Sequence, residues 1–359
     1  MCCLCFTHWL QYQYFIIPIV KKTRILYLGN MLSQKGFTPT AIEQLGPLLQ
    51  EEGYEVKYAS NRINKISRLL DMLGVVMKYR STVNVVLIDT YSTTAFYFAW
   101  LAAFICRRLG LPNIPVLHGG NLPHRMDGSP KLSATLFGNS LTNIAVSPYL
   151  QEELLRRSYK ATLIPNSINI AEYPFEERQQ VQPNLLWVRS FHKIYNPQMA
   201  LEVLKQLLPK YPQAKLTMVG PDKDGSLQQC KDLASQLGIA DSVQFTGQLP
   251  KTEWTALAED HDIFINTSTI DNMPFSIIEA MALGMIVVST NVGGIPKLVN
   301  DVNGVLVNSN DVVAMTNAIE NLLSSNTTRY STSARNTAEE YDWQNVKSSW
   351  INLLDSITA

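Results

Sequence analysis

Short runs of β-branched and aliphatic residues alternate with helical patterns along the first half of the chain. Runs without strict alternation of polar and apolar positions are typical of strands that helices cover on both faces. Alternation of such strands with helices predicts a parallel sheet. We expect strands at residues 24–29, 54–59, 83–89, 115–118, 143–147 and 161–165.

The same alternation begins again after a segment that has no periodicity. Residues 170–183 are rich in Glu, Gln and Pro, which predicts an interdomain linker with a boundary near residue 178. Beyond the linker we expect strands at residues 185–188, 216–220, 243–247, 263–267, 286–290 and 305–307. The predicted fold class is therefore α/β, with two Rossmann-like, doubly wound parallel sheets. Where two such sheets face each other, their carboxyl ends line a central cleft.

The chain divides into four predicted parts. They are an extension of unclear role at 1–20, an N-terminal domain at 21–178, a C-terminal domain at 179–338 and a final helix at 339–359. The final helix is amphipathic, because Trp343, Val346, Trp350 and Leu353 recur every three to four residues. In the extension, the apolar run 15–20 follows polar residues and precedes no small-residue cleavage site. It fits a weak interfacial anchor or a segment without a role in the fold, and we favour the second interpretation.

Two helical patterns in the first half differ in polarity. Residues 95–106 are almost wholly apolar but too few to span a bilayer, which predicts a buried crossover helix. Residues 61–80 combine an apolar stripe with basic side chains, namely Arg62, Lys65, Arg68, Lys78 and Arg80. Such a helix can lie on an anionic membrane, or it can pack on its own sheet with its charges in water. The second interpretation is slightly favoured.

Composition narrows the functional classes. The 359 residues are 46% hydrophobic, enough for two ordinary cores. Thirty basic and thirty acidic residues give no formal net charge, so no global field recruits nucleic acid. The five cysteines show neither a zinc-site spacing nor a disulfide framework, which favours a reducing compartment. We expect a cytoplasmic protein, with peripheral attachment at the inner membrane face as the alternative that residues 61–80 raise.

The segment from Asp271 to Glu279 is the most informative in the chain. Pro274 ends an extended loop, and Ser276 and Glu279 have the spacing of a capping box at a helix start. The first turn of a helix presents free backbone N–H groups and the positive end of the helix dipole, where phosphate binds well. The spacing therefore predicts an anion site at this helix start. The plainer interpretation is that Ser276 and Glu279 only satisfy each other.

The surrounding residues resemble a known family. The segment 271–279, the apolar run 285–290 and the turn Asn291-Val-Gly-Gly-Ile-Pro296 resemble the Glu-x7-Glu signature of family 4 retaining glycosyltransferases, also called glycosyl transferases group 1. The resemblance implies the GT-B fold and transfer of a sugar from a nucleotide-diphosphate sugar, UDP- or GDP-linked. It implies a carbohydrate or lipid-linked acceptor, with polysaccharide or glycolipid biosynthesis as the family's association. No cofactor and no metal are expected.

The family's roles carry over to particular residues. Glu279 matches the second acid, which grips the ribose, and Asp271 matches the first acid, normally Glu, which approaches the sugar hydroxyls. Arg189 and Lys193, after the first strand of the second domain, match the pair that neutralises the diphosphate. Their spacing is one residue shorter than usual, which leaves His192 as a substitute for Lys193. His118 matches a residue that contacts the transferred sugar.

Further residues are expected to bind substrate through the same resemblance. They are Gly36 in the first loop, Gly247 in the loop that receives the nucleotide base, and Asn272, Met273, Pro274, Phe275 and Ser276 ahead of Glu279. The pair Asp222 and Asp224 resembles the metal signature of other sugar transferases, but two loop acids supply only part of a hard-cation shell. The alternative functions are a catalytically silent scaffold or partner subunit, which the Asp at position 271 suggests, and a nucleotide-sugar epimerase.

Overall fold

The computed structural model describes residues 22–36 and 39–358 and contains two parallel α/β sheets, each of six strands. The expectation for residues 1–20 lies outside the described residues. The N-terminal sheet has the order β2-β1-β3-β4-β5-β6. Its elements are β1 (Arg24–Leu28), α1 (Ala41–Glu51), β2 (Glu55–Ala59), α2 (Lys65–Tyr79), β3 (Val85–Thr90), α3 (Ala95–Arg108), β4 (Asn113–Leu117), α4 (Leu122–Gly128), α5 (Pro130–Phe137), β5 (Ile144–Ala145), α6 (Pro148–Arg156) and β6 (Thr162–Leu163).

The C-terminal sheet has the order β12-β11-β10-β7-β8-β9, and all of its pairings are parallel. Its elements are β7 (Asn184–Val188), α7 (Pro197–Leu207), β8 (Lys215–Val219), α8 (Ser226–Gln236), β9 (Val243–Gly247), α9 (Lys251–Ala256), β10 (Ile263–Asn266), α10 (Phe275–Ala282), β11 (Ile286–Thr290), β12 (Gly304–Val307), α11 (Val312–Leu323) and α12 (Thr328–Glu340). The predicted fold class is confirmed.

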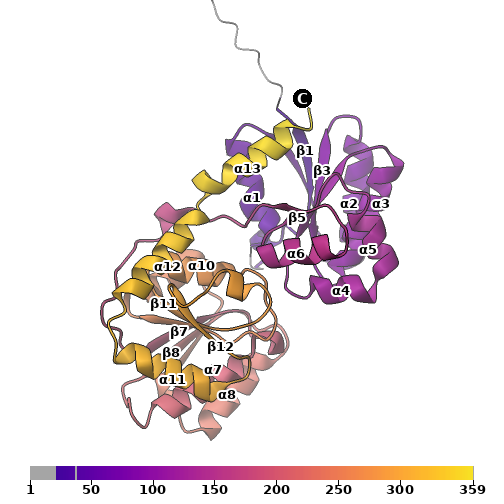
Figure 1. Ribbon diagram of the computed structural model, residues 1–359. Helices are drawn as coiled ribbons and strands as arrows, with labels where there is room; N and C mark the ends of the chain where they lie inside the picture. Colours follow the sequence, from indigo (N-terminus) through magenta and orange to yellow (C-terminus); the bar gives the residue numbers. More distant parts are fainter. Residues whose placement is uncertain (1–21, 37–38, 359) are drawn as a thin grey trace, which may run out of the picture.

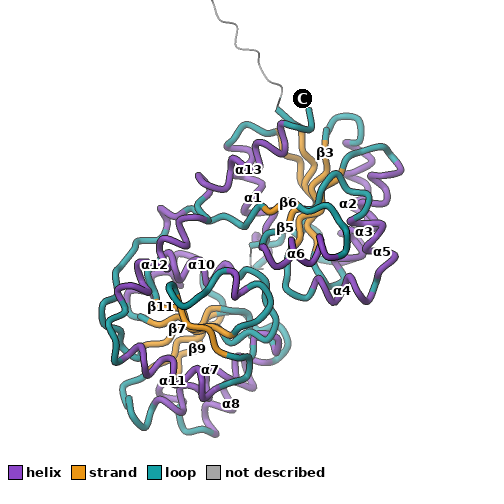
Figure 2. The backbone as a smooth tube through the Cα atoms, in the orientation of Figure 1, coloured by secondary structure: helices purple, strands orange, loops and turns teal. Residues whose placement is uncertain are grey.

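The strand order of each sheet reverses at one point. In the N-terminal sheet the reversal lies between β1 and β3, and in the C-terminal sheet between β7 and β10. At such a point the loops leave the two strands in opposite directions and open a crevice at the carboxyl ends. Figure 2 shows loops between the two orange sheets. The reversal points therefore mark where a ligand site is expected.

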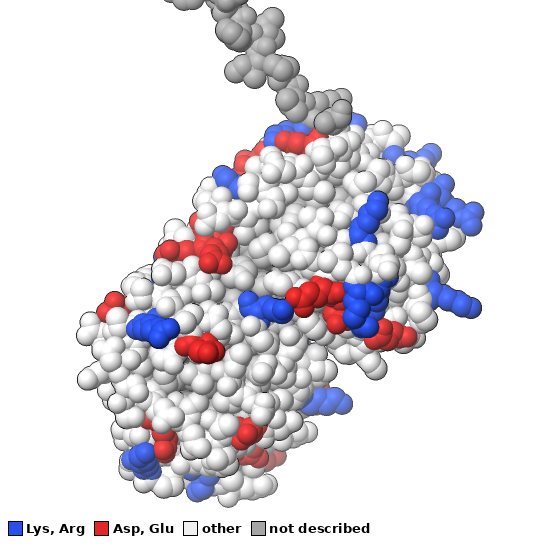
Figure 3. All heavy atoms as spheres, viewed as in Figure 1, with Lys and Arg blue, Asp and Glu red and all other residues white. Residues whose placement is uncertain are grey.

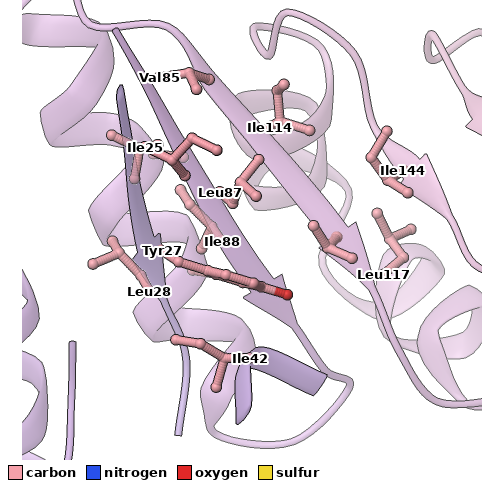
Figure 4. Packing of buried hydrophobic residues seen from close by; sticks show 14 of the residues in the cluster. Ile25, Tyr27, Leu28, Ile42, Val85, Leu87, Ile88, Ile114, Leu117 and Ile144 are labelled. Atoms are coloured by element: carbon pink, nitrogen blue, oxygen red, sulfur yellow. The ribbon is translucent and has the colours of Figure 1, made fainter. Parts of the chain in front are cut away.

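Each sheet has its own apolar core. In the N-terminal domain the inward side chains of β1, β3 and β4 pack together, and the ring of Tyr27 lies among aliphatic side chains (Figure 4). In the C-terminal domain, clusters on both faces of the sheet contain Trp187 and Ile278. Strands that are buried on both faces need apolar side chains at nearly every position. This is why near-continuous apolar runs predicted them.

The last helix, α13 (Trp343–Asp355), returns to the N-terminal domain. Figure 1 shows it leaving the C-terminal domain and lying beside α1 and β1. Trp343 and Trp350 belong to the N-terminal core, and the hydroxyl of Tyr54 donates a hydrogen bond to Asp355 at 2.8 Å. The helix begins at Trp343, because α12 ends at Glu340 and a short turn follows. The chain thus crosses between domains twice.

Candidate functional site

Two oppositely charged side chains meet at the reversal point of the C-terminal sheet. Arg189 directly follows β7, and Asp271 lies in the loop after the neighbouring strand β10. Nη2 of Arg189 donates to Oδ2 of Asp271, and the guanidinium lies 4.8 Å from the ring centre of Tyr195. Burial by itself lowers the pKa of Arg189, but the Asp271 carboxylate, together with Tyr195 and Glu279, outweighs burial and the net shift is upward. The site therefore holds a permanent, partly buried cation.

The loop around Asp271 is held from two sides. Its Oδ1 accepts a hydrogen bond from the backbone N–H of Asn272 at 2.9 Å, and Ser268 Oγ donates to Oδ2 at 3.1 Å. Gly293 and Gly294 lie against the backbone of Asp271 and Asn272, so closely that a Cβ at either glycine would collide with a carbonyl oxygen there. The two glycines of the predicted turn thus allow the loops after β10 and β11 to touch.

The start of α10 differs from the sequence prediction. Pro274, not Ser276, is the N-cap, and its carbonyl accepts from the N–H of Ile277 at 3.1 Å. The predicted capping box between Ser276 and Glu279 is wrong. The helix starts at Phe275, one residue ahead of Ser276. Its N-cap, Pro274, is extended (φ −71°, ψ 123°) and has no N–H, so no reciprocal capping-box bond can form there.

This change leaves the two side chains of the expected capping box available for other contacts. The Ser276 hydroxyl is buried and has no hydrogen-bond partner among the described residues. It lies in the first turn of α10, where the backbone N–H groups of Phe275 and Ser276 also have no acceptor among the described residues. A buried hydroxyl beside free N–H groups suits an anionic ligand better than it suits the fold alone.

Glu279 faces residues that the sequence did not single out. Its Oε1 accepts a hydrogen bond from Tyr173 at 2.8 Å, and Lys251 Nζ lies 3.9 Å from the same oxygen. Burial raises the pKa of Glu279, while Tyr173, Lys251 and Arg189 oppose the shift. The side chain keeps 12% of its surface exposed. The side chain is therefore not completely sealed from solvent.

The polar partners of Glu279 come from two different segments. Tyr173 belongs to the predicted linker, and Lys251 begins α9, with its ammonium 4.5 Å from the Tyr173 ring centre. The one sequence signal for Tyr173 is an aromatic residue, two before Phe175, in a Glu- and Pro-rich stretch, and nothing in the pattern related it to Glu279.

On the N-terminal domain, His118 directly follows β4 and is buried. Its Nε2 lies 3.0 Å from Oδ1 of Asp89, which also accepts a hydrogen bond from Tyr27 at 3.0 Å. The ring of Tyr91 stacks on the imidazole with centres 5.0 Å apart. Asp89 was expected only as the end of a strand, so the sequence analysis missed its relation to His118.

The two domains touch at this site. The Ser147 hydroxyl donates a hydrogen bond to Oδ1 of Asn272, and Gly120 lies directly against the backbone of Asp271. Lys297 and Glu152 form an ion pair across the same boundary at 2.7 Å. A cavity of about 20 Å³, lined by His118 from one domain and Phe275 from the other, lies between them. It holds about one water molecule, so a sugar requires side chains or domains to move.

The remaining predicted site residues have other surroundings. Lys193 is exposed, and its backbone N–H donates to Asp224 at 3.0 Å. Gly36 and Gly247 have positive φ, and apart from their chain neighbours no described residue has an atom within 4 Å of the place where a Cβ would be. Met273 is buried in the C-terminal core. The structure thus joins Arg189 to Asp271 directly and brings Glu279 close enough to influence the pKa of Arg189.

The acids of the Asp-x-Asp pair take part in the loop before α8. Asp222 accepts from the N–H of Gly225 at 2.9 Å, and Asp224 accepts from the N–H of Ser226 at 3.2 Å. Within residues 22–36 and 39–358, no three His, Cys, Asp or Glu side chains are grouped so that they could hold a metal ion. The two carboxylates are thus used in shaping this turn.

Comparison with known proteins identifies the C-terminal half. Residues 170–340 match the family "Glycosyl transferases group 1". The D-inositol 3-phosphate glycosyltransferase of Corynebacterium urealyticum is 27% identical over 179 residues, which is 48% of this chain and 42% of that protein. The chain therefore aligns with less than half of this curated relative.

Solved structures resemble the whole fold. Sucrose-phosphate synthase from Thermosynechococcus elongatus superposes with a TM-score of 0.76 at 16% identity, over 94% of this chain and 99% of the other. Anabaena Alr3699/HepE in complex with UDP-glucose gives a TM-score of 0.73 at 18% identity, over 93% and 100%. The arrangement of two facing Rossmann-like domains is thus shared with these proteins.

Proposed function

Because residues 170–340 belong to the group 1 glycosyltransferases, we propose that this protein is a retaining glycosyltransferase. It moves a sugar from a nucleotide-diphosphate sugar to a carbohydrate or lipid-linked acceptor. The observation that carries the proposal is the grouping of Arg189, Ser276 and Glu279 at the reversal point of the C-terminal sheet.

The leaving group in this reaction is a nucleoside diphosphate, which needs positive charge and hydrogen-bond donors. Arg189 supplies the cation, and its buried Nε has no hydrogen-bond partner within the described chain. The Ser276 hydroxyl and the free N–H groups of α10 supply neutral donors. Together they neutralise a diphosphate without a metal ion, in the manner of oriented donors that stabilise developing charge.

The donor's other parts meet the two acids and the opposing domain. Glu279 accepts the ribose hydroxyls. Asp271 exchanges its contact with Arg189 for the hydroxyls of the transferred sugar once the diphosphate binds that guanidinium. His118 contacts the same sugar from the N-terminal side. The acceptor hydroxyl then attacks on the face from which the diphosphate departs, and the diphosphate oxygen takes its proton.

A donor screen tests the proposal. Purified protein is mixed with UDP- and GDP-sugars, with and without EDTA, and nucleotide release is measured; the anomeric configuration of any product is read by NMR. We expect turnover or slow donor hydrolysis with at least one donor, unaffected by EDTA, and loss of it in Arg189→Gln. Calorimetry with the same donors measures binding. Binding of a nucleotide sugar without turnover favours the silent scaffold, and absence of binding by every donor removes the proposal.

We propose in addition that α2 attaches the protein to an anionic membrane. None of the helices in the described part of the chain is long and apolar enough to cross a bilayer. Ile66 is 72% exposed, Leu70 63% and Ile63 55%. Basic side chains flank this apolar stripe, and Asp71 is the one acidic residue between positions 60 and 88. Figure 3 shows several Lys and Arg side chains at the right-hand edge of the N-terminal domain.

Sedimentation with lipid vesicles tests the attachment. We expect binding to vesicles that contain anionic lipid, weak binding to neutral ones, and a loss of binding in Ile66→Ser/Leu70→Ser. Val313→Ser is the matched control, because Val313 is also exposed, at 58%, but lies on α11 of the other domain. Equal sedimentation with both kinds of vesicle contradicts an electrostatic contribution to membrane attachment.

A further inference from the structure

A hydrogen-bonded group of three buried side chains crosses neighbouring strands of the N-terminal domain. Tyr27 lies on β1, Asp89 on β3 and His118 after β4. We propose that Asp89 is a positioning residue that fixes His118 in the tautomer with the proton on Nε2, so that Nδ1 accepts a hydrogen bond from a hydroxyl of the transferred sugar. This inference rests on the proposed function of the interdomain site.

The tautomer follows from the hydrogen bonds. An ionised carboxylate can only accept hydrogen bonds, and Oδ1 of Asp89 lies 3.0 Å from both the Tyr27 hydroxyl and Nε2 of His118. The two neighbours must therefore both donate to this oxygen. In a neutral imidazole whose Nε2 carries the hydrogen, Nδ1 keeps a lone pair and acts as an acceptor.

The ring is fixed in place as well as in tautomer. The backbone N–H of His118 donates to the carbonyl of Thr90 at 2.8 Å, and Tyr91 stacks on the imidazole. On the far side of the carboxylate, a Cβ at Gly29 would lie 2.6 Å from Oδ2 of Asp89. The backbone at Gly29 thus closes against the carboxylate, which leaves Asp89 little freedom to turn away from His118.

Folding alone does not account for this carboxylate. The Asp89 side chain is 1% exposed, and its Oδ2 has no hydrogen-bond partner among the described residues. A buried carboxylate with one unsatisfied oxygen costs stability compared with an apolar side chain of similar size. A role in holding the imidazole explains why a charged group is retained at this point in the core.

The position of His118 indicates what its free nitrogen meets. His118 and Tyr27 line the cavity between the domains together with Phe275 of α10, whereas Asp89 is absent from the described residues that line it. The Nε2 edge of the ring faces Asp89, so the Nδ1 edge is the one left for the cavity. A lone pair attracts a hydroxyl hydrogen and repels a phosphate oxygen. The expected ligand group is therefore a sugar hydroxyl, not the diphosphate.

Nitrogen NMR of histidine-labelled protein tests the tautomer without any need for activity. The shifts of Nδ1 and Nε2 distinguish which nitrogen carries hydrogen. We expect the Nε2–H tautomer for His118 in the native protein, and the same tautomer in Asp89→Asn, where an amide oxygen can still accept both hydrogen bonds. In Asp89→Ala the signal should move toward a mixture. A native signal with hydrogen on Nδ1, or an unchanged signal in Asp89→Ala, overturns the inference.

Kinetics separate positioning from a merely structural role. With the donor that the screen identifies, Asp89→Ala should lower kcat at least 10-fold, and Asp89→Asn should recover most of that loss. In a His118→Ala background, Asp89→Ala should have little further effect, because the two residues act as one unit. If Asp89→Ala lowers kcat by the same factor in the His118→Ala background as in the native protein, the inference is overturned.

A matched control and a folding check complete the test. Tyr58→Phe removes a hydroxyl whose hydrogen bond, to Gln50, is exposed, and kcat should not change. If circular dichroism shows that Asp89→Ala does not fold, the tautomer of His118 can still be read by NMR in Asp89→Asn and Tyr27→Phe. If every donor fails in the screen, the proposed function fails, while the NMR result still decides whether Asp89 sets the tautomer of His118.

Discussion

Glu279 is a carboxylate that is largely removed from water beside Tyr173. Burial raises its pKa above the usual 4.5, and the Tyr173 hydroxyl and two nearby cations reduce the shift without cancelling it. The folded protein thus binds more protons than the unfolded chain between the unfolded and folded pKa values, and stability falls as pH rises through that window. At neutral pH the ionised Glu279 is a cost to folding. Under the proposed function, ribose hydroxyls that donate to Glu279 would offset this cost.

We predict that Glu279→Gln separates stability from binding. The melting temperature at pH 7 should equal or exceed that of the native protein, and the difference should widen as pH rises above about 4.5. Affinity for UDP or GDP should fall about 10- to 100-fold, from the loss of about 1.5–3 kcal/mol in a charge-assisted hydrogen bond. Thermal melts at pH 4 to 8 and calorimetry measure both. Glu339→Gln, an exposed partner of Arg335, should change neither.

At the scale of the element, the start of α10 determines what Ser276 does. The predicted capping box would make Ser276→Ala cost about 1 kcal/mol, whereas the structure leaves its hydroxyl without a partner in the described part of the chain. We therefore predict that Ser276→Ala keeps or slightly raises the melting temperature and weakens nucleotide binding.

Asn64→Ala provides the comparison for this prediction. Asn64 is the N-cap of α2, and its side chain accepts from the N–H groups of Ile66 and Ser67 at 2.9 and 3.1 Å. Its removal should cost about 1 kcal/mol and leave nucleotide binding unchanged. Both variants are measured by thermal unfolding and by calorimetry with UDP or GDP. A Ser276→Ala variant that loses as much stability as Asn64→Ala would mean that Ser276 caps the helix after all.

The sequence predicted elements better than it predicted contacts between them. Apolar runs such as 263–267 and 286–290 predicted strands because burial on both faces demands them. The Gly293-Gly294 turn was recognised as part of a motif, although its close approach to Asp271 depends on how two loops fold back. The partners of Glu279 and His118, Tyr173 and Asp89, come from distant segments. No local pattern encodes such a contact.

The contacts of Arg178, in the predicted linker, are another example of contacts that the sequence did not predict. The boundary near residue 178 remains a prediction, but the segment around it is no free spacer. Arg178 is buried and its guanidinium donates to the carbonyls of Glu176, Leu283 and Ala258 at 2.8, 2.8 and 2.6 Å. A polar, aperiodic sequence predicted an interdomain linker, whereas backbone carbonyls of neighbouring segments supply acceptors that composition cannot reveal.

At the scale of the whole molecule, the N-terminal domain is completed by the end of the chain. Trp343 and Trp350 are 4% and 2% exposed in its core, and Thr23 donates a hydrogen bond to the carbonyl of Leu354 at 2.6 Å. The stability of the first sheet therefore depends on a helix that is translated last. A chain that ends before α13 leaves this apolar surface in water.

We predict that removal of residues 343–359 destabilises the N-terminal domain selectively. Hydrogen exchange should show lost protection in β1, β2 and α1, while β7 to β12 stay protected, because α13 packs on the first sheet and not on the second. Trp350→Ala should cost about 3–5 kcal/mol in the same domain, and Tyr97→Ala, at a side chain 43% exposed on α3, far less. Equal loss of protection in both sheets would mean that the domains unfold as one cooperative unit, with α13 joining them rather than completing the first.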